Sequence, residues 1–210
     1  ATEVLGLHGV KPVAVEKYGP KDTDITSQLT KIRDAGADTV IIYGIADGAA
    51  NVLRSMEKIN YMPTTLGTWG NLSSLLPRLA GPKMADHLIL AASTTEDTNA
   101  KTKALGERVR KNFPTLTTFP CSAQAYDSVM LLAAAMKAAG TTDGEKVAAA
   151  LEGINGVEGV IKTYNKPFSK TDHEGLGVAD FYLAKWKNGT TVVRYEDAVT
   201  KSLTAADLKK

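Results

Sequence analysis

Strand-like and helix-like patterns alternate along the first half of the chain, and no other feature of the sequence constrains the fold as much. A continuous β-branched run at 38–44 is typical of a strand covered on both faces, and an amphipathic stretch at 47–60 follows it. Strand-like runs at 64–67 and 88–92 enclose a segment at 71–76 with helical spacing. Strands separated by helices pair in parallel, because each crossover returns the chain to the same end of the sheet. The sequence therefore predicts an α/β fold with a doubly wound parallel sheet between two layers of helices.

Two further elements are predicted near the start of the chain. Residues 12–18 alternate over a short β-rich run that Gly19 and Pro20 end, which indicates a strand. Residues 24–36 have helical spacing, with Asp24 in the capping position and a glycine at the end. We expect a helix there with one buried face.

The second half of the chain has a different character. We predict a charged helix at about 98–112 and a long apolar helix at about 122–139, which we expect to be buried on most of its circumference. A short helix at 145–151 and a glycine-rich loop at 153–159 follow.

The chain ends in a predicted β-hairpin. Strand patterns at 179–186 and 190–195 are joined by Lys-Asn-Gly at 187–189, which is a strong turn signal. We expect residues 205–210 to form a frayed tail.

Composition and charge argue against several classes of protein. The 210 residues carry 25 Lys and Arg against 23 Asp and Glu, so the net charge of +2 is far from the basic surface that nucleic acid requires. Cys121 is the one cysteine and the three histidines stand far apart, which argues against a zinc site. The longest apolar run, 129–136, is too short to cross a membrane, and the opening residues lack the pattern of a signal peptide. We expect neither a membrane span nor a signal peptide in this sequence.

Motifs for catalysis or phosphate binding are absent from the sequence. No Gly-x-Gly-x-x-Gly follows a predicted strand, and neither a P-loop nor a Gly-x-Ser-x-Gly elbow occurs. The segment 171–175 sets two carboxylates beside a histidine, but adjacent side chains diverge, so we interpret it as a polar turn fixed by Asx-type hydrogen bonds. Cys121 has no histidine near it in the sequence and is interpreted as a small buried or hinge residue. We predict no catalytic residue, no metal and no cofactor.

Two aromatic residues stand where ligands bind in this class of fold. In open α/β sheets, ligands bind beyond the carboxyl ends of the strands. Trp69 follows the predicted strand 64–67 and precedes Gly70, where the backbone can approach a neighbour closely. Tyr43 stands in the equivalent place at the end of its own strand. The alternative for both is a core position, in which the indole N–H of Trp69 would donate to a carbonyl oxygen.

Four segments of the chain resemble one family, in that family's order and spacing. They are residues 24–40, 66–71, 125–132 and 159–176, which together extend over nearly all of the chain. In these segments the chain is similar to the type 1 periplasmic solute-binding proteins of the branched-chain amino-acid (leucine/isoleucine/valine-binding) group. The resemblance implies a clamshell of two α/β lobes joined by crossover strands.

The resemblance covers only the later part of such a protein. It implies that residues 1–118 form the second lobe without its first strand, that 119–177 cross over and supply helices to the first lobe, and that 178–210 return as a hairpin with a tail. It also implies that the apolar helix at 122–139 lacks part of its support.

The resemblance further implies where a ligand binds. Contacts in the family carry over to Ile45, Ala46 and Trp69, next to Tyr43 and Gly70. The position of Trp69 usually holds a carboxylate that pairs with the ammonium group of the ligand, and a buried ammonium without that partner is strongly unfavourable. We therefore expect a ligand other than a simple α-amino acid, such as an aromatic or other small organic acid.

A binding protein without catalytic activity is the function that the resemblance implies. We expect a periplasmic component of an ABC importer that binds a branched-chain amino acid-like, aromatic or other small organic acid ligand, closes around it, and docks on a membrane permease. It would be monomeric when complete. The alternatives are a ligand-sensing regulatory module of the same fold and an α/β enzyme whose catalytic half lies upstream.

Overall fold

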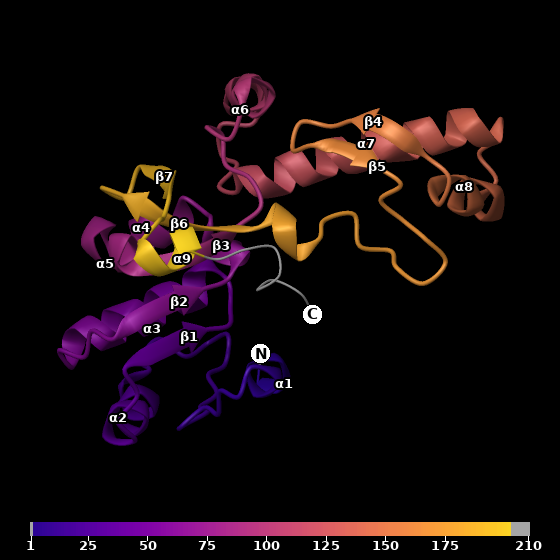
Figure 1. The fold of residues 1–210 in the computed structure, drawn as a ribbon. Coiled ribbons are helices and arrows are strands. Elements are labelled where there is room, and N and C mark those ends of the chain that lie inside the picture. Colours follow the sequence, from indigo (N-terminus) through magenta and orange to yellow (C-terminus); the bar gives the residue numbers. More distant parts are fainter. Residues whose placement is uncertain (1, 203–210) are drawn as a thin grey trace. The chain divides into compact units, whose positions relative to one another are not determined.

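The structure, a computed structural model, describes residues 2–202, which form two compact units (Figure 1). Unit 1 holds the residues up to 91 together with Leu183–Tyr195, and unit 2 holds Ala92–Tyr182 and the segment from 196 onward. The predicted tail at 205–210 lies outside the described residues. The lobe boundaries expected after 118 and 177 do not coincide with the limits of these units, and the assignment of lobes stays a prediction.

Unit 1 is built on a five-stranded sheet with the order β1-β2-β3-β6-β7. Its strands are β1 (Thr39–Ile42), β2 (Thr64–Gly67), β3 (Leu88–Ala92), β6 (Tyr182–Lys187) and β7 (Thr191–Arg194). The first three are parallel, with Val40 beside Thr65 and Leu66 beside Ile89. β6 and β7 form the antiparallel hairpin. The predicted α/β class, the parallel strands and the terminal hairpin are confirmed, and the hairpin makes the complete sheet mixed.

The helices of unit 1 either precede β1 in the chain or connect β1 to β2 and β2 to β3. They are α1 (Thr2–Leu7), α2 (Thr26–Asp34), α3 (Ala46–Lys58), the short 3-10 helix η1 (Trp69–Asn71), α4 (Leu75–Ala80) and α5 (Pro82–His87). The helices predicted at 24–36 and 47–60 are confirmed as α2 and α3. α3 packs against α2, α4 and α5, and its side chains Leu53 and Met56 are fully buried.

The helix predicted at 71–76 is wrong in its position, because α4 begins only at Leu75. Asn71 is drawn into the interior by hydrogen bonds to other loops, and Ser73 Oγ accepts a hydrogen bond from the Leu75 N–H at the start of α4. Gly81, at φ +84°, then ends α4, and Pro82 opens the unpredicted helix α5.

The segment 12–18 is extended, but it is not a strand of any sheet, contrary to the prediction. Its exposure alternates as expected: Ala14 and Glu16 are half-buried, while Val13 and Val15 are exposed. A period of two predicts an extended backbone, whereas a ladder also needs a neighbouring edge within hydrogen-bonding distance.

β1 is covered on one face only, although its composition predicts burial on both. Val40 and Ile42 are buried, whereas Ile41 and Tyr43 are exposed. β1 stands at the edge of the sheet and pairs with β2 alone among the described strands.

Unit 2 consists mainly of helices and a small hairpin. Its elements are α6 (Ala100–Asn112), α7 (Phe119–Ala139), α8 (Gly144–Leu151), β4 (Asn155–Glu158), β5 (Thr163–Asn165), the 3-10 helix η2 (Val178–Asp180) and α9 (Ala198–Ser202). The helices predicted at 98–112, 122–139 and 145–151 are confirmed as α6, α7 and α8. The loop predicted at 153–159 is partly wrong, because β4 pairs with β5 there in antiparallel fashion, with a bulge beside Gly156. Gly156 has φ +69°, a conformation that glycine adopts without strain.

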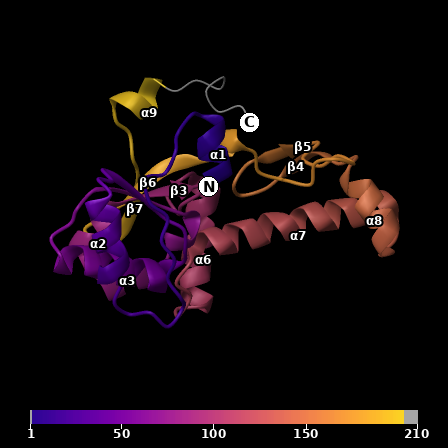
Figure 2. The ribbon, with the colours of Figure 1, turned by 90° about the horizontal axis from the view of Figure 1, so that it is seen from below.

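α7 is a single long helix with α8 at its carboxyl end (Figure 2). It buries one stripe of residues spaced four apart, from Ala123 through Asp127 and Leu131 to Ala135, whereas Val129 is 63% exposed. The prediction that α7 is buried around most of its circumference is therefore wrong. One apolar face of α7 is uncovered, as the resemblance implies for this helix. Cys121, expected to be buried or at a hinge, is exposed near the start of the helix.

Candidate functional site

Three of the predicted ligand contacts form an exposed apolar group at the carboxyl ends of β1 and β2. Tyr43 is 77% exposed, Ile45 is 67% exposed and Trp69 is 43% exposed. Because β1 and β2 are adjacent and parallel, the loops that follow them leave the sheet at the same edge. Two aromatic rings and a branched aliphatic side chain are thus presented to solvent where ligands bind in open α/β sheets.

A hydrogen-bonded frame joins the two loops beneath these side chains. Thr68 Oγ1 donates to the carbonyl oxygen of Gly44 at 2.8 Å, and Asn71 Nδ2 lies 3.2 Å from the same oxygen. Asn71 Nδ2 also donates to the Thr68 carbonyl oxygen at 3.1 Å, and its side chain is fully buried. The frame fixes the loop that carries Ile45 to the loop that carries Trp69. Sequence reasoning missed Thr68 and Asn71, although polar residues directly after a strand are a usable signal.

The glycines of the site are needed for contacts within the protein. A Cβ at Gly70 would lie 3.2 Å from Ile45 Cγ2, and a Cβ at Gly67 would lie 3.0 Å from Leu88 Cδ2. Gly70, predicted as a ligand contact, is half-buried and lets the loop after β2 come close to Ile45.

Tyr18 is a further neighbour of the site that sequence reasoning missed. A Cβ at Gly44 would collide with the Tyr18 hydroxyl, and a Cβ at Gly48 would lie 2.9 Å from the Tyr18 ring. Burial, followed by the negative charge of Asp47, raises the pKa of Tyr18 above its usual value. The ring therefore packs on the start of α3 and closes one side of the loop after β1.

Ala46 is part of the site through its backbone only. It is the first residue of α3 and its side chain is 4% exposed. The residue before it, Ile45, is the N-cap and makes no capping hydrogen bond through its side chain. An aliphatic side chain where a polar cap is preferred directs apolar surface outward at the start of the helix.

The other tryptophan, Trp186, has the kind of core position that was considered for Trp69. Trp186 on β6 is 7% exposed, and its indole Nε1 lies 3.4 Å from the carbonyl oxygen of Asn71. The core interpretation is therefore wrong for Trp69 and equally wrong for Tyr43, which is the most exposed of the three apolar side chains.

The other side chains that could bind a metal do not come together in the part of the chain that the structure describes. No three His, Cys, Asp or Glu side chains among residues 2–202 come together as a metal site, and no helix in that range is long and apolar enough to cross a membrane. The polar turn at 171–175 is confirmed, because Asp172 Oδ1 accepts the Glu174 N–H at 2.9 Å in an Asx-type turn.

Comparison with known proteins gives consistent matches in sequence and in fold. A family model described as "Periplasmic binding protein" matches residues 1–191. The Leu/Ile/Val-binding protein homolog 3 of Brucella melitensis biotype 1 is 25% identical over 185 residues, which are 88% of this chain and 48% of that protein. The chain thus spans about half the length of the curated relative that it matches.

Solved structures share the fold at low identity. A periplasmic binding protein type 1 from Bordetella pertussis Tohama I matches with a TM-score of 0.77 and 21% identity, over 93% of this chain and 56% of that one. A fatty acid ABC transporter substrate-binding protein from Thermomonospora curvata matches with a TM-score of 0.69 and 18% identity, over 89% of this chain and 50% of that one. The resemblance drawn from the four sequence segments is confirmed by these matches.

Proposed function

The chain belongs to the periplasmic binding protein family, and from that premise we propose that it is all or part of the solute-binding component of an ABC-type importer. Such a component binds a small molecule outside the cytoplasm and delivers it to a permease in the membrane. The proposal therefore includes a periplasmic location and a permease partner. It assigns binding, and no chemical step, to the residues at the ends of β1 and β2.

The observation that carries the proposal is the exposed apolar group of Tyr43, Ile45 and Trp69 on a rigid hydrogen-bonded frame. Binding sites for small molecules are mostly apolar, with a few polar groups that fix the orientation of the ligand. The three side chains supply the apolar surface, and the frame of Thr68 and Asn71 holds the two loops that present it. Trp69 offers a flat face on which an aromatic or aliphatic body can stack.

The ligand that suits this surface is an aromatic or other small organic acid, in place of a simple α-amino acid. None of the three side chains carries a charge that would pair with an ammonium group. The carboxylate nearest in sequence is that of Asp47, whose Oδ1 accepts a hydrogen bond from the Gly48 N–H on its own helix. The names of two relatives refer to different ligands: one refers to Leu/Ile/Val, which are α-amino acids, and the other to a fatty acid, which is an organic acid.

Binding by closure would complete the site. In clamshell proteins a ligand held on one lobe gains contacts with the other lobe as the hinge closes, which stabilises the closed form. The group at β1 and β2 would be one half of such a site, and the closed form would be the one that docks on the permease.

Isothermal titration calorimetry with benzoate and with leucine tests the ligand class. We expect benzoate to give measurable heat and leucine to give none. Trp69→Ala should weaken benzoate binding by about tenfold or more and leave the fold intact, because the Trp69 side chain is 43% exposed. The buried Trp186 provides an internal fluorescence reference that the ligand should not change. Nanomolar binding of leucine would overturn the proposed ligand class.

A further inference from the structure

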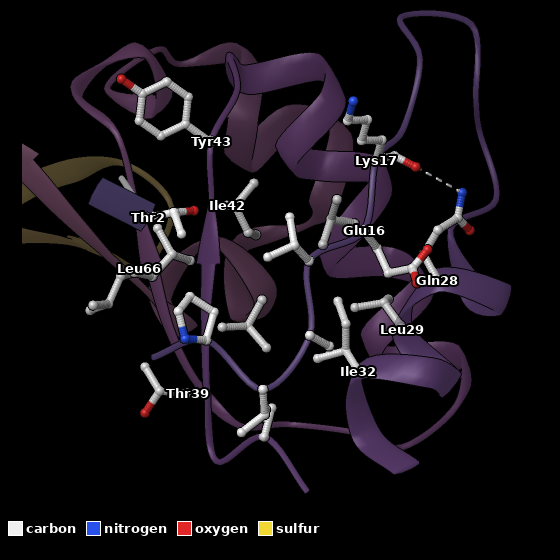
Figure 3. A pocket seen from close by; sticks show the side chains of 18 of the residues that line it. Thr2, Glu16, Lys17, Gln28, Leu29, Ile32, Thr39, Ile42, Tyr43 and Leu66 are labelled. Carbon is white, nitrogen blue, oxygen red and sulfur yellow. Dashed lines mark hydrogen bonds between the residues drawn. The ribbon is translucent and has the colours of Figure 1, made fainter. Parts of the chain in front are cut away.

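Two cavities in the structure differ in the side chains that line them. The larger, of about 660 Å³, lies in unit 1 along β1 and the inner face of α2. Figure 3 shows mainly aliphatic side chains in it, among them Ile32, Ile42 and Leu66. The smaller, of about 370 Å³, is a groove in unit 2 that is lined by charged and apolar side chains together. Sites that recognise a partner combine apolar surface with a few polar groups, and the groove in unit 2 has both.

The groove lies between α6, α7 and residues 158–160 at the end of β4. α6 and α7 pack on each other. The Asp127 carboxylate on α7 accepts the Val160 N–H at 2.6 Å, and Lys101 on α6 pairs with Glu158 at 3.1 Å. The three walls of the groove are therefore fixed to one another, and all of them belong to unit 2.

Arg108 supplies the free charge of the groove. The charge of Lys101 is compensated by Glu158, whereas the guanidinium of Arg108 makes no ion pair and no hydrogen bond within residues 2–202. Lys111 follows three residues later, so it lies on the same side of α6, and its ammonium is equally unpaired in that range. The uncompensated positive charge thus extends from the groove along the helix.

The rest of the groove is apolar, apart from one hydroxyl group. Leu105 is buried at its base, and Met130 and Tyr126 on α7 are partly exposed above it. Methionine adapts its shape to different apolar partners. The Tyr126 hydroxyl makes no hydrogen bond within the described part of the chain, so it is free to donate to an incoming oxygen.

We propose that this groove docks an acidic segment of a partner polypeptide, which places one apolar side chain on Met130 and Leu105 and pairs a neighbouring carboxylate with Arg108. A guanidinium binds a carboxylate through two parallel hydrogen bonds, which fixes the segment in one orientation. A second acidic residue of the segment pairs with Lys111. The proposal goes beyond the ligand site at the ends of β1 and β2 and does not depend on it.

A polypeptide suits the groove better than a small acid or a membrane does. The volume of about 370 Å³ is near the lower end of the range for small-molecule pockets, about 300–1,000 Å³. A small acid within the groove would leave Lys111 unused, whereas a chain with several carboxylates reaches both cations. Attraction to anionic lipid takes clusters of about 4–8 basic residues, and this side of α6 has two that are unpaired.

Fluorescence anisotropy with a labelled peptide tests the proposal on the 210-residue chain. The probe is fluorescein-labelled Gly-Glu-Asp-Leu-Glu-Asp-Gly, and the control peptide has Gln for each Glu and Asn for each Asp. We expect saturable binding of the acidic peptide that weakens as salt is added, and no binding of the neutral one. Replacing the leucine of the probe by serine should weaken binding by about fivefold, because the apolar contact is lost. Absence of saturable binding, or equal binding of the acidic and neutral peptides, would overturn the proposal.

A matched pair of charge variants separates docking from general attraction to a basic helix. Arg108→Gln and Lys103→Gln remove the same charge from α6, but Lys103 is exposed outside the groove. We expect Arg108→Gln to weaken binding of the acidic peptide by about tenfold or more. Lys103→Gln should weaken it by less than about twofold. Equal effects would show attraction to the net charge alone and would overturn the proposal.

A second pair tests the apolar floor. Met130→Ala removes part of the groove, whereas Val129→Ala changes an exposed neighbour on α7 that does not line it. We expect about fivefold weaker binding for Met130→Ala and unchanged binding for Val129→Ala. Circular dichroism should show the same helix content in both variants, since both side chains are exposed. Unchanged binding in Met130→Ala would contradict the proposed seat of the apolar side chain.

Three further results would assign the groove to another occupant and overturn the proposal. One is binding to phosphatidylglycerol vesicles that requires Arg108 while the peptide does not bind. Another is self-association of the chain that Arg108→Gln abolishes, which would make a second copy the occupant. The third is complete displacement of the peptide by benzoate, which would show a small-molecule site. Trp69→Ala should bind the peptide normally, so that failure of the proposed ligand site and failure of the groove remain distinguishable.

Discussion

The carboxylate of Asp127 on α7 accepts a hydrogen bond of 2.6 Å from the backbone N–H of Val160, which follows β4. Its other oxygen accepts the Ile161 N–H at 3.0 Å and the Tyr164 hydroxyl of β5 at 2.9 Å. Asp127 is 1% exposed, so this carboxylate is a buried acceptor for three donors. It fixes α7 to the β4–β5 hairpin.

Replacing this carboxylate should destabilise unit 2 strongly. Asp127→Ala leaves three donors without an acceptor in the interior, which costs about 3 kcal/mol or more of unfolding free energy. Urea unfolding followed by circular dichroism measures the loss. The neighbouring Ser128→Ala removes only a bond of an exposed hydroxyl to the Gln124 carbonyl and should change stability by less than about 0.5 kcal/mol. A similar unfolding midpoint for both variants would contradict this role of Asp127.

Gly159 lies against the same carboxylate and should not tolerate a side chain. A Cβ at this position would collide with the Asp127 oxygens, so Gly159→Ala forces the carboxylate away from Val160 and Ile161. We expect a loss of about 2 kcal/mol, as for other overpacked positions. Gly144→Ala on α8 is the matched control, because no atom lies within 4 Å of its added Cβ. Alanine is the better helix former, so the control should be neutral or stabilising by up to about 1 kcal/mol. Equal thermal midpoints for the two variants would refute the contact.

The stability of unit 2 should decrease at alkaline pH because of Tyr164. Burial, followed by the hydrogen bond to Asp127 and the charge of that carboxylate, raises the pKa of Tyr164 above its usual value of 10.0. The neutral phenol is therefore favoured in the folded state, and its contribution is complete below pH 10 and is lost as the pH rises above 10. Tyr164→Phe should lower stability at neutral pH by about 1–2 kcal/mol and should flatten the alkaline decrease. Urea unfolding at a series of pH values measures both effects, and an unchanged alkaline slope in the variant would exclude Tyr164 as its source.

The fold could be predicted from the sequence wherever the signal is local. β2 and β3 begin and end at the predicted residues, because Pro63 precedes β2 and Gly67 ends it, and β3 is a short apolar run. The segment 12–18 could not be settled in this way, since its alternation predicts an extended backbone but does not supply a neighbouring edge. β4 was not predicted for a related reason: the glycines around it indicate a loop, and its partner β5 is held by a hydrogen bond from Tyr164 to Asp127, far away in the sequence.

The candidate site could be predicted in its position but not in its construction. The rule that ligands bind at the carboxyl ends of parallel strands indicated Tyr43 and Trp69, and both are exposed at that edge. The bonds from Thr68 and Asn71 to the Gly44 carbonyl join residues 24 and 27 positions apart, and no pattern within one segment reveals such a pair. The same bonds bury Asn71 and displace the helix that the sequence predicts at 71–76.

The frame between the two loops should control how firmly Ile45 and Trp69 are held. Thr68→Val keeps the shape of the side chain but removes the hydrogen bond to the Gly44 carbonyl oxygen and one acceptor of Asn71 Nδ2. We expect a loss of about 1 kcal/mol in stability, the value of one partly buried hydrogen bond. Amides of 44–46 and 68–70 should exchange with deuterium several-fold faster, because the loops open locally more often.

If the proposed ligand site is right, the affinity of Thr68→Val for benzoate should fall by a similar factor, since the two loops must first be ordered to bind. Thr64→Val, at an exposed position at the start of β2, should change none of these quantities. Unchanged exchange at 44–46 in Thr68→Val would show that Asn71 alone holds the loop after β1.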